Sequence, residues 1–213
     1  MGRSARRTRE TAVPARGAEL AAVLRDAAEA LILERGPQGF SLREVARRAR
    51  VSEAAPYRYF PNKEALLAGV AESGFGTLAQ RMEAHRERVK DPGRRFQELG
   101  VTYVRFALEH PAYLRIMFGP EISDKSAYPA LKAAADHAFA LLVAVIADAQ
   151  RAGIARSGDA KEMALAAWAL IHGLSALLID GQLKGDARTL REAEALAARL
   201  TRLLRIGLET ERG

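Results

Sequence analysis

The chain has 213 residues, a formal net charge of +7 and no cysteine. The lack of cysteine excludes disulfide bonds, thiol catalysis and cysteine-ligated zinc or iron–sulfur sites. No uninterrupted apolar run approaches about 18 residues, so we expect no membrane-spanning helix. The arginine-rich start lacks the apolar core of a secretory signal, and we therefore expect a cytoplasmic protein.

Almost all of the positive charge lies at the amino-terminal end. Residues 1–63 hold thirteen Lys and Arg against seven Asp and Glu, whereas residues 64–213 hold twenty against nineteen. A basic end on an otherwise balanced chain suits a polyanionic partner. Within it, residues 1–16 carry five arginines without periodicity and predict a flexible basic arm. Such an arm either follows DNA or only keeps the chain soluble.

The first predicted elements are two helices. Apolar residues at helical spacing between Leu20 and Leu31 predict the first of them. Ser41 and Glu44 then form a capping box, in which a hydroxyl and a carboxylate satisfy each other's free amides. Apolar positions at i, i+3, i+4 and i+7 after this box predict a short second helix that ends at Ala49.

A further short helix is predicted from Ser52 to Phe60, and Asn62 can cap a longer one that begins at Lys63. A cation at a helix start opposes the helix dipole, unless a phosphate neutralises it. Two short helices followed by a basic helix start are typical of helix-turn-helix DNA binding. Arginines on such a pair are usually only solvated, but two exposed tyrosines on either side of Arg58 are unusual on a plain surface.

At these residues the chain resembles the TetR family of transcriptional regulators. The resemblance covers the Ser-initiated helix of residues 41–49, Val51-Ser52, Tyr57-Arg58-Tyr59-Phe60 and Lys63-Glu64-Ala65-Leu66-Leu67. It implies that the second helix of the pair enters the major groove. The DNA-binding residues that we predict on this basis are Arg43, Ser52, Glu53, Ala54, Ala55, Tyr57, Arg58, Tyr59 and Lys63.

Two residues depart from the family pattern. Arg50 stands in the turn where the family usually has glycine, and a left-handed backbone there costs on the order of 1 kcal/mol. Pro56 replaces a large aliphatic residue and removes one amide, which the first turn of a helix tolerates. Neither residue lies on the presumed DNA face, so we expect the motif to be intact.

The rest of the chain is also predicted to be helical. Helices are expected over residues 63–90, 92–109, 111–118 and 127–151, followed by two more that open on Asp159 with Glu162 and on Thr189 with Glu192. No alternating strand pattern of useful length occurs, and we therefore predict an all-α fold. Residues 17–77 are expected to form a three-helix DNA-binding domain, and residues 78–213 a larger regulatory and dimerisation domain.

The last two helices predict self-association. The first of them is apolar around much of its circumference, and the second carries one apolar stripe at i, i+4, i+7 and i+8. A helix that is apolar on several faces must bury them within its domain or against a partner. In regulators of the TetR type the two helices pair with their copies in a dimer, and a two-fold dimer reads two half-sites of a palindromic operator. The predicted interface residues are Leu170, Leu174, Leu177, Leu196, Leu200 and Leu203.

Aromatic residues in the second domain predict a small-molecule site. Residues 110–119, together with Trp168, His172 and Gly173, are similar to the WHG-type subgroup of TetR C-terminal domains, which implies a regulatory domain that receives a ligand. Aromatic bulk with a few polar atoms is the usual make-up of a ligand cavity, although the same residues also build plain helical cores. The candidates are Tyr103, Phe106, His110, Tyr113, Met117, Phe118, Trp168 and His172.

Signatures of catalysis are missing from the sequence. The four histidines show no metal-ligand spacing, and the chain has no GxSxG, P-loop or GxGxxG motif. We therefore predict no enzyme, no cofactor and no metal site. The predicted function is a homodimeric, ligand-responsive repressor, and the alternative is a constitutive or architectural DNA-binding dimer that has no small-molecule ligand.

Overall fold

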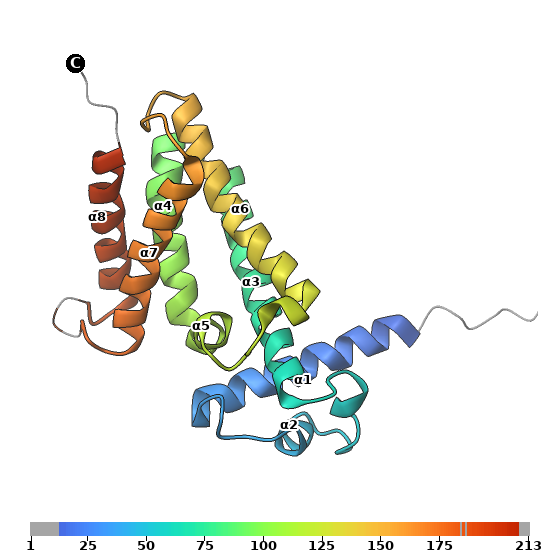
Figure 1. Cartoon of the computed structure of the whole chain (residues 1–213). Helices are drawn as coiled ribbons and strands as arrows, with labels where there is room; N and C mark the ends of the chain where they lie inside the picture. The colour runs from blue at the N-terminus through green and yellow to red at the C-terminus, as the bar shows by residue number, and fades with distance from the viewer. Residues whose placement is uncertain (1–12, 184, 186, 209–213) are drawn as a thin grey trace, which may run out of the picture. The chain divides into compact units, whose positions relative to one another are not determined.

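The computed structural model describes residues 13–183, 185 and 187–208, which form helices joined by turns and loops (Figure 1). No strand occurs among these residues, and the predicted all-α fold is confirmed. The chain divides into two compact units, of which one ends at Val70 and the other begins at Ala71. This division lies inside helix α3 (Lys63–Arg88), the helix that also contains the predicted boundary at residue 77.

The amino-terminal unit consists of α1 (Val13–Arg35), α2 (Leu42–Arg48), the 3-10 helix η1 (Pro56–Arg58) and the first turns of α3. Residues 13–16 belong to α1, so this part of the predicted arm is helical instead, and residues 1–12 lie outside the described residues. Apolar side chains from all these helices form the core of the unit, among them Leu24, Ala28, Ile32, Val45, Pro56, Leu66 and Val70.

The predicted local features of α2, of the turn after it and of the start of α3 are confirmed. The backbone amide of Ser41 donates to Glu44 Oε2 at 2.9 Å, and the Glu44 amide donates to Ser41 Oγ at 3.4 Å, which completes the capping box. Arg50 has a φ of 56°, as expected for a residue that stands where the family has glycine. Asn62 caps α3 by accepting from the Ala65 amide at 2.8 Å.

The predicted helix from Ser52 to Phe60 does not form, and the expectation of an intact helix pair is wrong in this respect. Residues 53–55 form turns, and only the single turn of η1 follows them. The first α-helical hydrogen bond would run from the amide of residue 56 to the Ser52 carbonyl, but Pro56 has no amide hydrogen. The Ser52 carbonyl accepts from Ala55 instead, at 2.9 Å, in the tighter 3-10 pattern.

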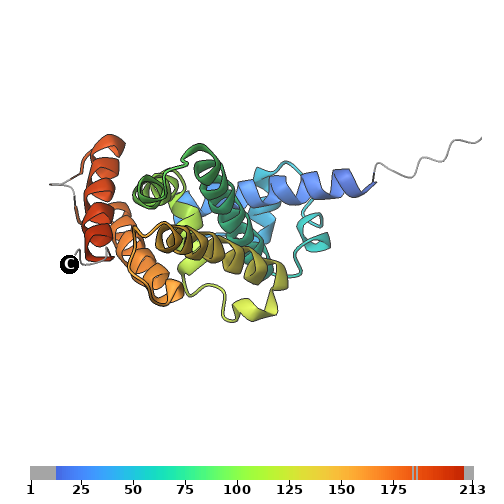
Figure 2. The same cartoon turned by 90° about the horizontal axis from the view of Figure 1, so that it is seen from above.

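The second unit contains the rest of α3 and five further helices. These are α4 (Pro92–Glu109), α5 (Pro111–Phe118), α6 (Pro129–Arg151), α7 (Ala160–Ile179) and α8 (Leu190–Leu208), with the 3-10 helix η2 (Lys125–Ala127) before α6. Helix α4 packs against α6, α7 and α8, and Figure 2 shows α6, α7 and α8 in sequence along one side of the unit. Phe106, Ile116, Met117, Leu131 and Ile146 are among the fully buried residues.

Helices α6 and α7 are long and apolar enough to cross a membrane, as judged by length and composition alone. Both pack against α4 and against each other within the second unit. Core helices of helical domains have the same composition, because several of their faces are covered by neighbours. We therefore interpret α6 and α7 as helices that pack within this domain, in agreement with the expectation from the sequence.

Candidate DNA-binding surface and internal cavity

The turn between α2 and α3 presents a polar and aromatic surface. Tyr57 is 51% exposed and Tyr59 37% exposed, and Arg58 between them is exposed as well. The adjoining apolar residues Pro56 and Phe60 are buried and attach the turn to the core of the unit. The two tyrosines therefore stay at the surface although each is large and partly apolar, which is typical of a binding surface.

The predicted DNA-binding residues of the turn separate into two groups. Ser52, Glu53 and Ala54 are exposed, whereas Ala55 is only 9% exposed and belongs to the core. The side chain of Ala55 therefore presents almost no surface to a duplex, contrary to the prediction. The prediction for Ala55 came from the resemblance to the TetR family, and the resemblance does not specify the tighter local geometry that buries this side chain.

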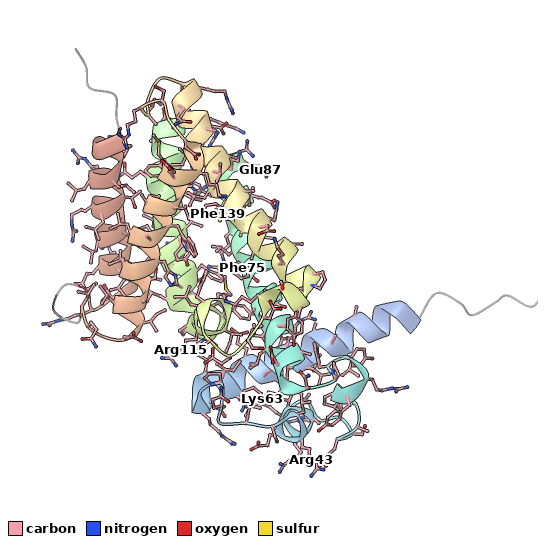
Figure 3. The ribbon with its side chains drawn as sticks, viewed as in Figure 1. Arg43, Lys63, Phe75, Glu87, Arg115 and Phe139 are labelled. Atoms are coloured by element: carbon pink, nitrogen blue, oxygen red, sulfur yellow. The ribbon has the colours of Figure 1, made fainter. Side chains whose placement is uncertain are left out.

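Arg43 extends from α2 beside this turn, and Figure 3 shows it at the outer edge of the unit. Its side chain is 70% exposed and its Nε lies 3.8 Å from a carboxylate oxygen of Glu53, which is itself 59% exposed. Such a long, exposed ion pair contributes little to stability. A phosphate can therefore compete with Glu53 for the guanidinium at small cost.

Lys63, at the start of α3, is engaged within its own unit. Its Nζ donates to the backbone carbonyl of Gln38 at 3.2 Å and lies 4.5 Å from the centre of the Phe40 ring. Burial lowers the pKa of Lys63, and the nearby carboxylate of Glu44 opposes this effect. In this arrangement Lys63 holds the loop before α2, so it reaches a phosphate only through its remaining ammonium hydrogens.

Four other arginines of the unit are exposed, and two of them form ion pairs. Arg35 pairs with Glu44 at 2.8 Å and Arg48 with Glu34 at 2.7 Å, and both pairs connect α1 to α2. Arg47 and Arg50 lie at the end of α2 and in the turn that follows. Sequence patterns offer no reason to choose among these arginines, because the pairing depends on how α1 and α2 pack.

The second unit has a partly open cavity of about 340 Å³ between α3, α4, α5, α6 and α7 (Figure 3 labels two of its residues, Phe75 and Phe139). Its wall is almost entirely apolar, apart from three charged residues that come from η2 and the first turns of α6. A cavity of this size and character is typical of small-molecule sites. The lining residues are Phe75, Leu78, Met82, Tyr103, Met117, Phe118, Lys125, Leu131, Lys132, Ala135, Asp136, Ala138, Phe139, Leu142 and Trp168.

Four of the eight predicted ligand-binding residues line this cavity, namely Tyr103, Met117, Phe118 and Trp168. Phe106, His110 and Tyr113 do not line it, because their rings stack on one another, with centroids 5.3 to 6.4 Å apart. The guanidinium of Arg81 lies 3.1 Å from Nε2 of His110, within hydrogen-bonding distance of one ring of this stack. These three residues are packing residues, which is the alternative that the sequence left open for them.

His172 lies behind the cavity wall. Its Nδ1 is 3.0 Å from the hydroxyl oxygen of Tyr103, and its ring meets that of Phe118 edge to face with centroids 4.5 Å apart. Burial raises the pKa of Tyr103 and lowers that of His172, so both side chains are neutral near pH 7. His172 therefore positions two cavity residues without lining the cavity itself.

Sequence reasoning missed the contribution of α3 and α6 to the cavity. Phe75, Leu78 and Met82 follow one face of α3, and Leu131, Ala135, Ala138, Phe139 and Leu142 follow one face of α6. Their helical spacing was visible in the sequence, but the same spacing is expected for any core helix. A second, smaller cavity of about 40 Å³ shares four wall residues with the first and extends to Thr201 and Leu204 of α8.

The predicted dimer residues differ in exposure. Leu177 is 46% and Leu203 64% exposed, whereas Leu170, Leu196 and Leu200 are half-buried. Leu174 is only 5% exposed and packs inside the unit, so it is unavailable to a partner in this structure. Leu165 and Leu190, which are not among the predicted interface residues, are exposed on the same two helices. The exposed leucines leave α7 and α8 with an apolar surface that no other described residue covers.

Together these features define a class of protein. A capped short helix, a turn that presents Tyr57 and Tyr59, and a following helix form a DNA-binding unit of the helix-turn-helix type. The second, larger unit is a helical domain with an apolar cavity. Bacterial transcriptional regulators combine two such units in one chain.

Comparison with known proteins assigns the family. Residues 24–70 match the model described as bacterial regulatory proteins of the tetR family, and residues 96–204 match the Tetracyclin repressor-like C-terminal domain. The chain therefore belongs to the TetR family of DNA-binding transcriptional regulators. The WHG-type subgroup remains a prediction.

Individual relatives agree with this assignment. The chain is 31% identical over 86 residues to the nucleoid occlusion factor SlmA of Haemophilus influenzae, which is 40% of this chain and 39% of that one. It is 32% identical over 128 residues to an uncharacterized HTH-type transcriptional regulator of Mycobacterium tuberculosis, 57% of this chain and 63% of that one. The chain thus spans less than two thirds of the length of these curated relatives.

Solved structures are similar over most of the chain. A protein of unknown function from Rhodococcus sp. RHA1 is 34% identical with a TM-score of 0.79, over 90% of this chain and 96% of that one. FadR of Bacillus subtilis, solved in complex with stearoyl-CoA, is 17% identical with a TM-score of 0.73, over 88% of this chain and 99% of that one. At this lower identity the likeness concerns the fold alone.

Proposed function

We propose that this regulator is a ligand-responsive repressor that binds a palindromic operator as a homodimer. The observation that carries the proposal is the combination of an exposed Tyr57-Arg58-Tyr59 surface in one unit with an apolar cavity of about 340 Å³ in the other. Helix α3 contributes its first turns to the DNA-binding unit and the rest to the second unit. A ligand that moves the second part of α3 therefore also acts on the part that ends the DNA-binding motif.

In this proposal the tyrosines and arginines have different roles at the DNA. Tyr57 and Tyr59 contact phosphates and base edges, whereas Arg43 and Arg58 contact the backbone and fix the register. Ser52, Glu53 and Ala54, which are exposed in the turn before η1, approach the base edges. Because η1 is a single turn, the base-reading surface is short, and two half-sites are needed to reach useful specificity.

The dimer is proposed to form through the exposed leucines of α7 and α8, chiefly Leu177 and Leu203. Isologous interfaces use the same patch on both subunits, and an uncovered apolar patch is the feature that such an interface requires. The two-fold axis of the dimer then matches the two-fold axis of a palindromic operator.

Ligand control is proposed from the cavity and from the structural neighbour FadR, which was solved with stearoyl-CoA. A coupling free energy of about 1–3 kcal/mol between the two sites, which is typical of allosteric proteins, would lower operator affinity between about 5- and 150-fold. We further propose that the protein acts in the cytoplasm and performs no catalysis, as expected for its family.

The alternative is a constitutive or architectural DNA-binding dimer. It is favoured by one observation, the similarity to the nucleoid occlusion factor SlmA, which is not named as a ligand-responsive protein. That similarity is limited to 40% of this chain. The cavity favours ligand control, because a domain that only dimerises has no use for an open apolar space in its core.

Selection of bound sequences from random duplex DNA tests the proposal. The purified protein should enrich an inverted repeat at near-physiological salt, and a Tyr57→Ala variant should lose that enrichment while keeping its fold. Binding without enrichment, which weakens steadily as salt rises, would contradict sequence-specific regulation and leave a general DNA-binding protein.

A further inference from the structure

The cavity of the second unit has charge at only one end. Its three charged residues are Lys125, Lys132 and Asp136, which come from η2 and the first part of α6. The opposite wall consists of apolar and aromatic side chains, including Leu142 and Trp168. A ligand that fills the cavity therefore meets apolar surface along most of its length and charge at one terminus.

Two of the three charges neutralise each other. Lys132 and Asp136 are one helical turn apart on α6 and form an ion pair. Both of their side chains are more than half exposed, at 59% and 65%. One positive charge at this end of the cavity remains, on Lys125.

Lys125 is held in place but is not neutralised. Its Nζ donates to the backbone carbonyl of Met117 at 2.8 Å, in the last turn of α5, where the helix dipole favours a cation. Within the described part of the chain no carboxylate forms an ion pair with Lys125, and the carboxylate of the adjacent Asp124 bonds to Ser126 instead. An ammonium group has three hydrogens, and the bond to Met117 uses only one of them.

From this arrangement we infer that the effector is an apolar chain that ends in an anionic group, and that Lys125 binds the anionic end. The inference rests on the proposed ligand-responsive function and names the chemical class of its ligand. A neutral apolar ligand would leave the Lys125 charge without a partner, whereas a cationic ligand would be repelled by it. A carboxylate or a phosphate has the required chemistry, because each accepts a charge-assisted hydrogen bond from an ammonium group.

Trp168 provides a direct measurement of occupancy. It is the one tryptophan in the sequence and it lines this cavity and the smaller one that shares part of its wall, so its fluorescence reports on ligands bound in this region of the second unit. Titrations with decanoate, decanol and decyltrimethylammonium compare anionic, neutral and cationic head groups on the same tail. Decanoate should bind roughly tenfold more tightly than decanol, because one hydrogen bond to a charged group contributes a free energy of about that size. Decyltrimethylammonium should bind most weakly of the three.

Two variants change the charge at this end in opposite directions. Lys125→Gln should remove the preference for decanoate and leave decanol affinity unchanged, which also shows that the cavity is intact. Asp136→Asn should release Lys132 from its ion pair and increase the preference for decanoate. Lys161→Gln, at the exposed start of α7 and away from the cavity, is the matched control and should change neither affinity.

The outcomes separate this inference from the function on which it rests. Equal affinity for decanoate and decanol, or a preference that survives Lys125→Gln, would overturn the anionic ligand while leaving a ligand cavity. If no probe changes the fluorescence of Trp168, the ligand-responsive function itself fails. A comparison of decanoate with decanoyl-coenzyme A identifies the source of the anion: tighter binding of decanoate indicates a free carboxylate, and tighter binding of the thioester indicates phosphate groups.

Discussion

The Phe60 ring lies so close to Gly69 that a Cβ atom at position 69 would be 2.9 Å from Cε1 of Phe60. Phe60 ends the exposed turn that carries Tyr57 and Tyr59, and Gly69 lies on α3. This contact holds the turn against the helix that follows it, because the missing side chain of Gly69 leaves room for the ring. The position of the turn that carries Tyr57 and Tyr59 therefore depends on the lack of a side chain at Gly69.

Replacing Gly69 by alanine should disturb this contact. We expect Gly69→Ala to destabilise the amino-terminal unit by about 1–3 kcal/mol, the usual cost of overpacking, and to reduce operator affinity. Thermal unfolding and DNA titration measure the two effects. Gly76→Ala is the matched control on the same helix: nothing lies within 4 Å of the added Cβ, so higher helix propensity should stabilise by about 0.5–1 kcal/mol. Equal stability of the two variants would contradict this role of Gly69.

The left-handed backbone of Arg50 predicts a stabilising substitution. Its φ of 56° is unfavourable for a residue with a side chain, whereas glycine adopts it freely. Arg50→Gly should therefore raise the free energy of unfolding by up to about 1 kcal/mol, because the relief of strain exceeds the larger entropy of the unfolded chain. Arg50→Ala removes the same charge but keeps the strain, and it should not stabilise. A stability gain shared by both variants would point to charge instead of backbone geometry.

Arg43 and Lys63 should differ in their effect on DNA binding. Arg43→Ala should weaken binding to all sequences alike and reduce the salt dependence by about one unit, because its exposed guanidinium is available to a phosphate. Lys63→Ala should reduce the salt dependence less and lower the thermal stability, since its ammonium group already bonds to Gln38. Affinity measured at several salt concentrations separates the two. Identical salt slopes for both variants would show that Lys63 leaves Gln38 in the complex.

The exposures on α7 and α8 predict different results for two leucines. Leu203→Asp should produce folded monomers with low operator affinity, because this side chain is 64% exposed and available to a partner subunit. Leu174→Asp should unfold the protein, because it would bury a charge at a position that is 5% exposed. Sedimentation and circular dichroism distinguish the results. A Leu203→Asp variant that remains a dimer would exclude this surface of α8 from the interface.

Stability should decrease as the pH falls from about 7 to 5. Burial lowers the pKa of His85, although a hydrogen bond to the Arg95 carbonyl opposes the shift, and burial also lowers the pKa of His172. The folded state thus favours neutral histidines, and the stability that they contribute is present above the unfolded pKa of about 6.5 and is lost below it. His85→Gln should reduce the slope of unfolding free energy against pH by at most about 1.4 kcal/mol per unit. An unchanged slope would exclude His85 as a contributor.

Local signals in the sequence predicted most of the helices. The capping box of Ser41 and Glu44 and the helices predicted over residues 92–109 and 111–118 depend on signals between neighbouring residues, and each is found as predicted. The left-handed turn at Arg50 was also predicted, because it followed from the position of the residue in a known motif. The segment around Pro56 is the exception among these local predictions. The missing amide of Pro56 is visible in the sequence, but its effect is larger than predicted, because the single turn η1 forms where an α-helix is expected.

The amino-acid sequence by itself determined the all-helical fold, the basic amino-terminal unit and the family, since these follow from periodicity, caps and local motifs. Only the tertiary structure decided which aromatic residues line the cavity and which stack elsewhere. Tyr103 and Phe106 both lie on α4, yet only Tyr103 reaches the cavity. The reason is that each face of α4 packs against helices distant in the sequence, and these helices decide what each side chain contacts. The same packing placed Leu174 inside and Leu203 outside, and left one positive charge on Lys125 at the end of an apolar cavity.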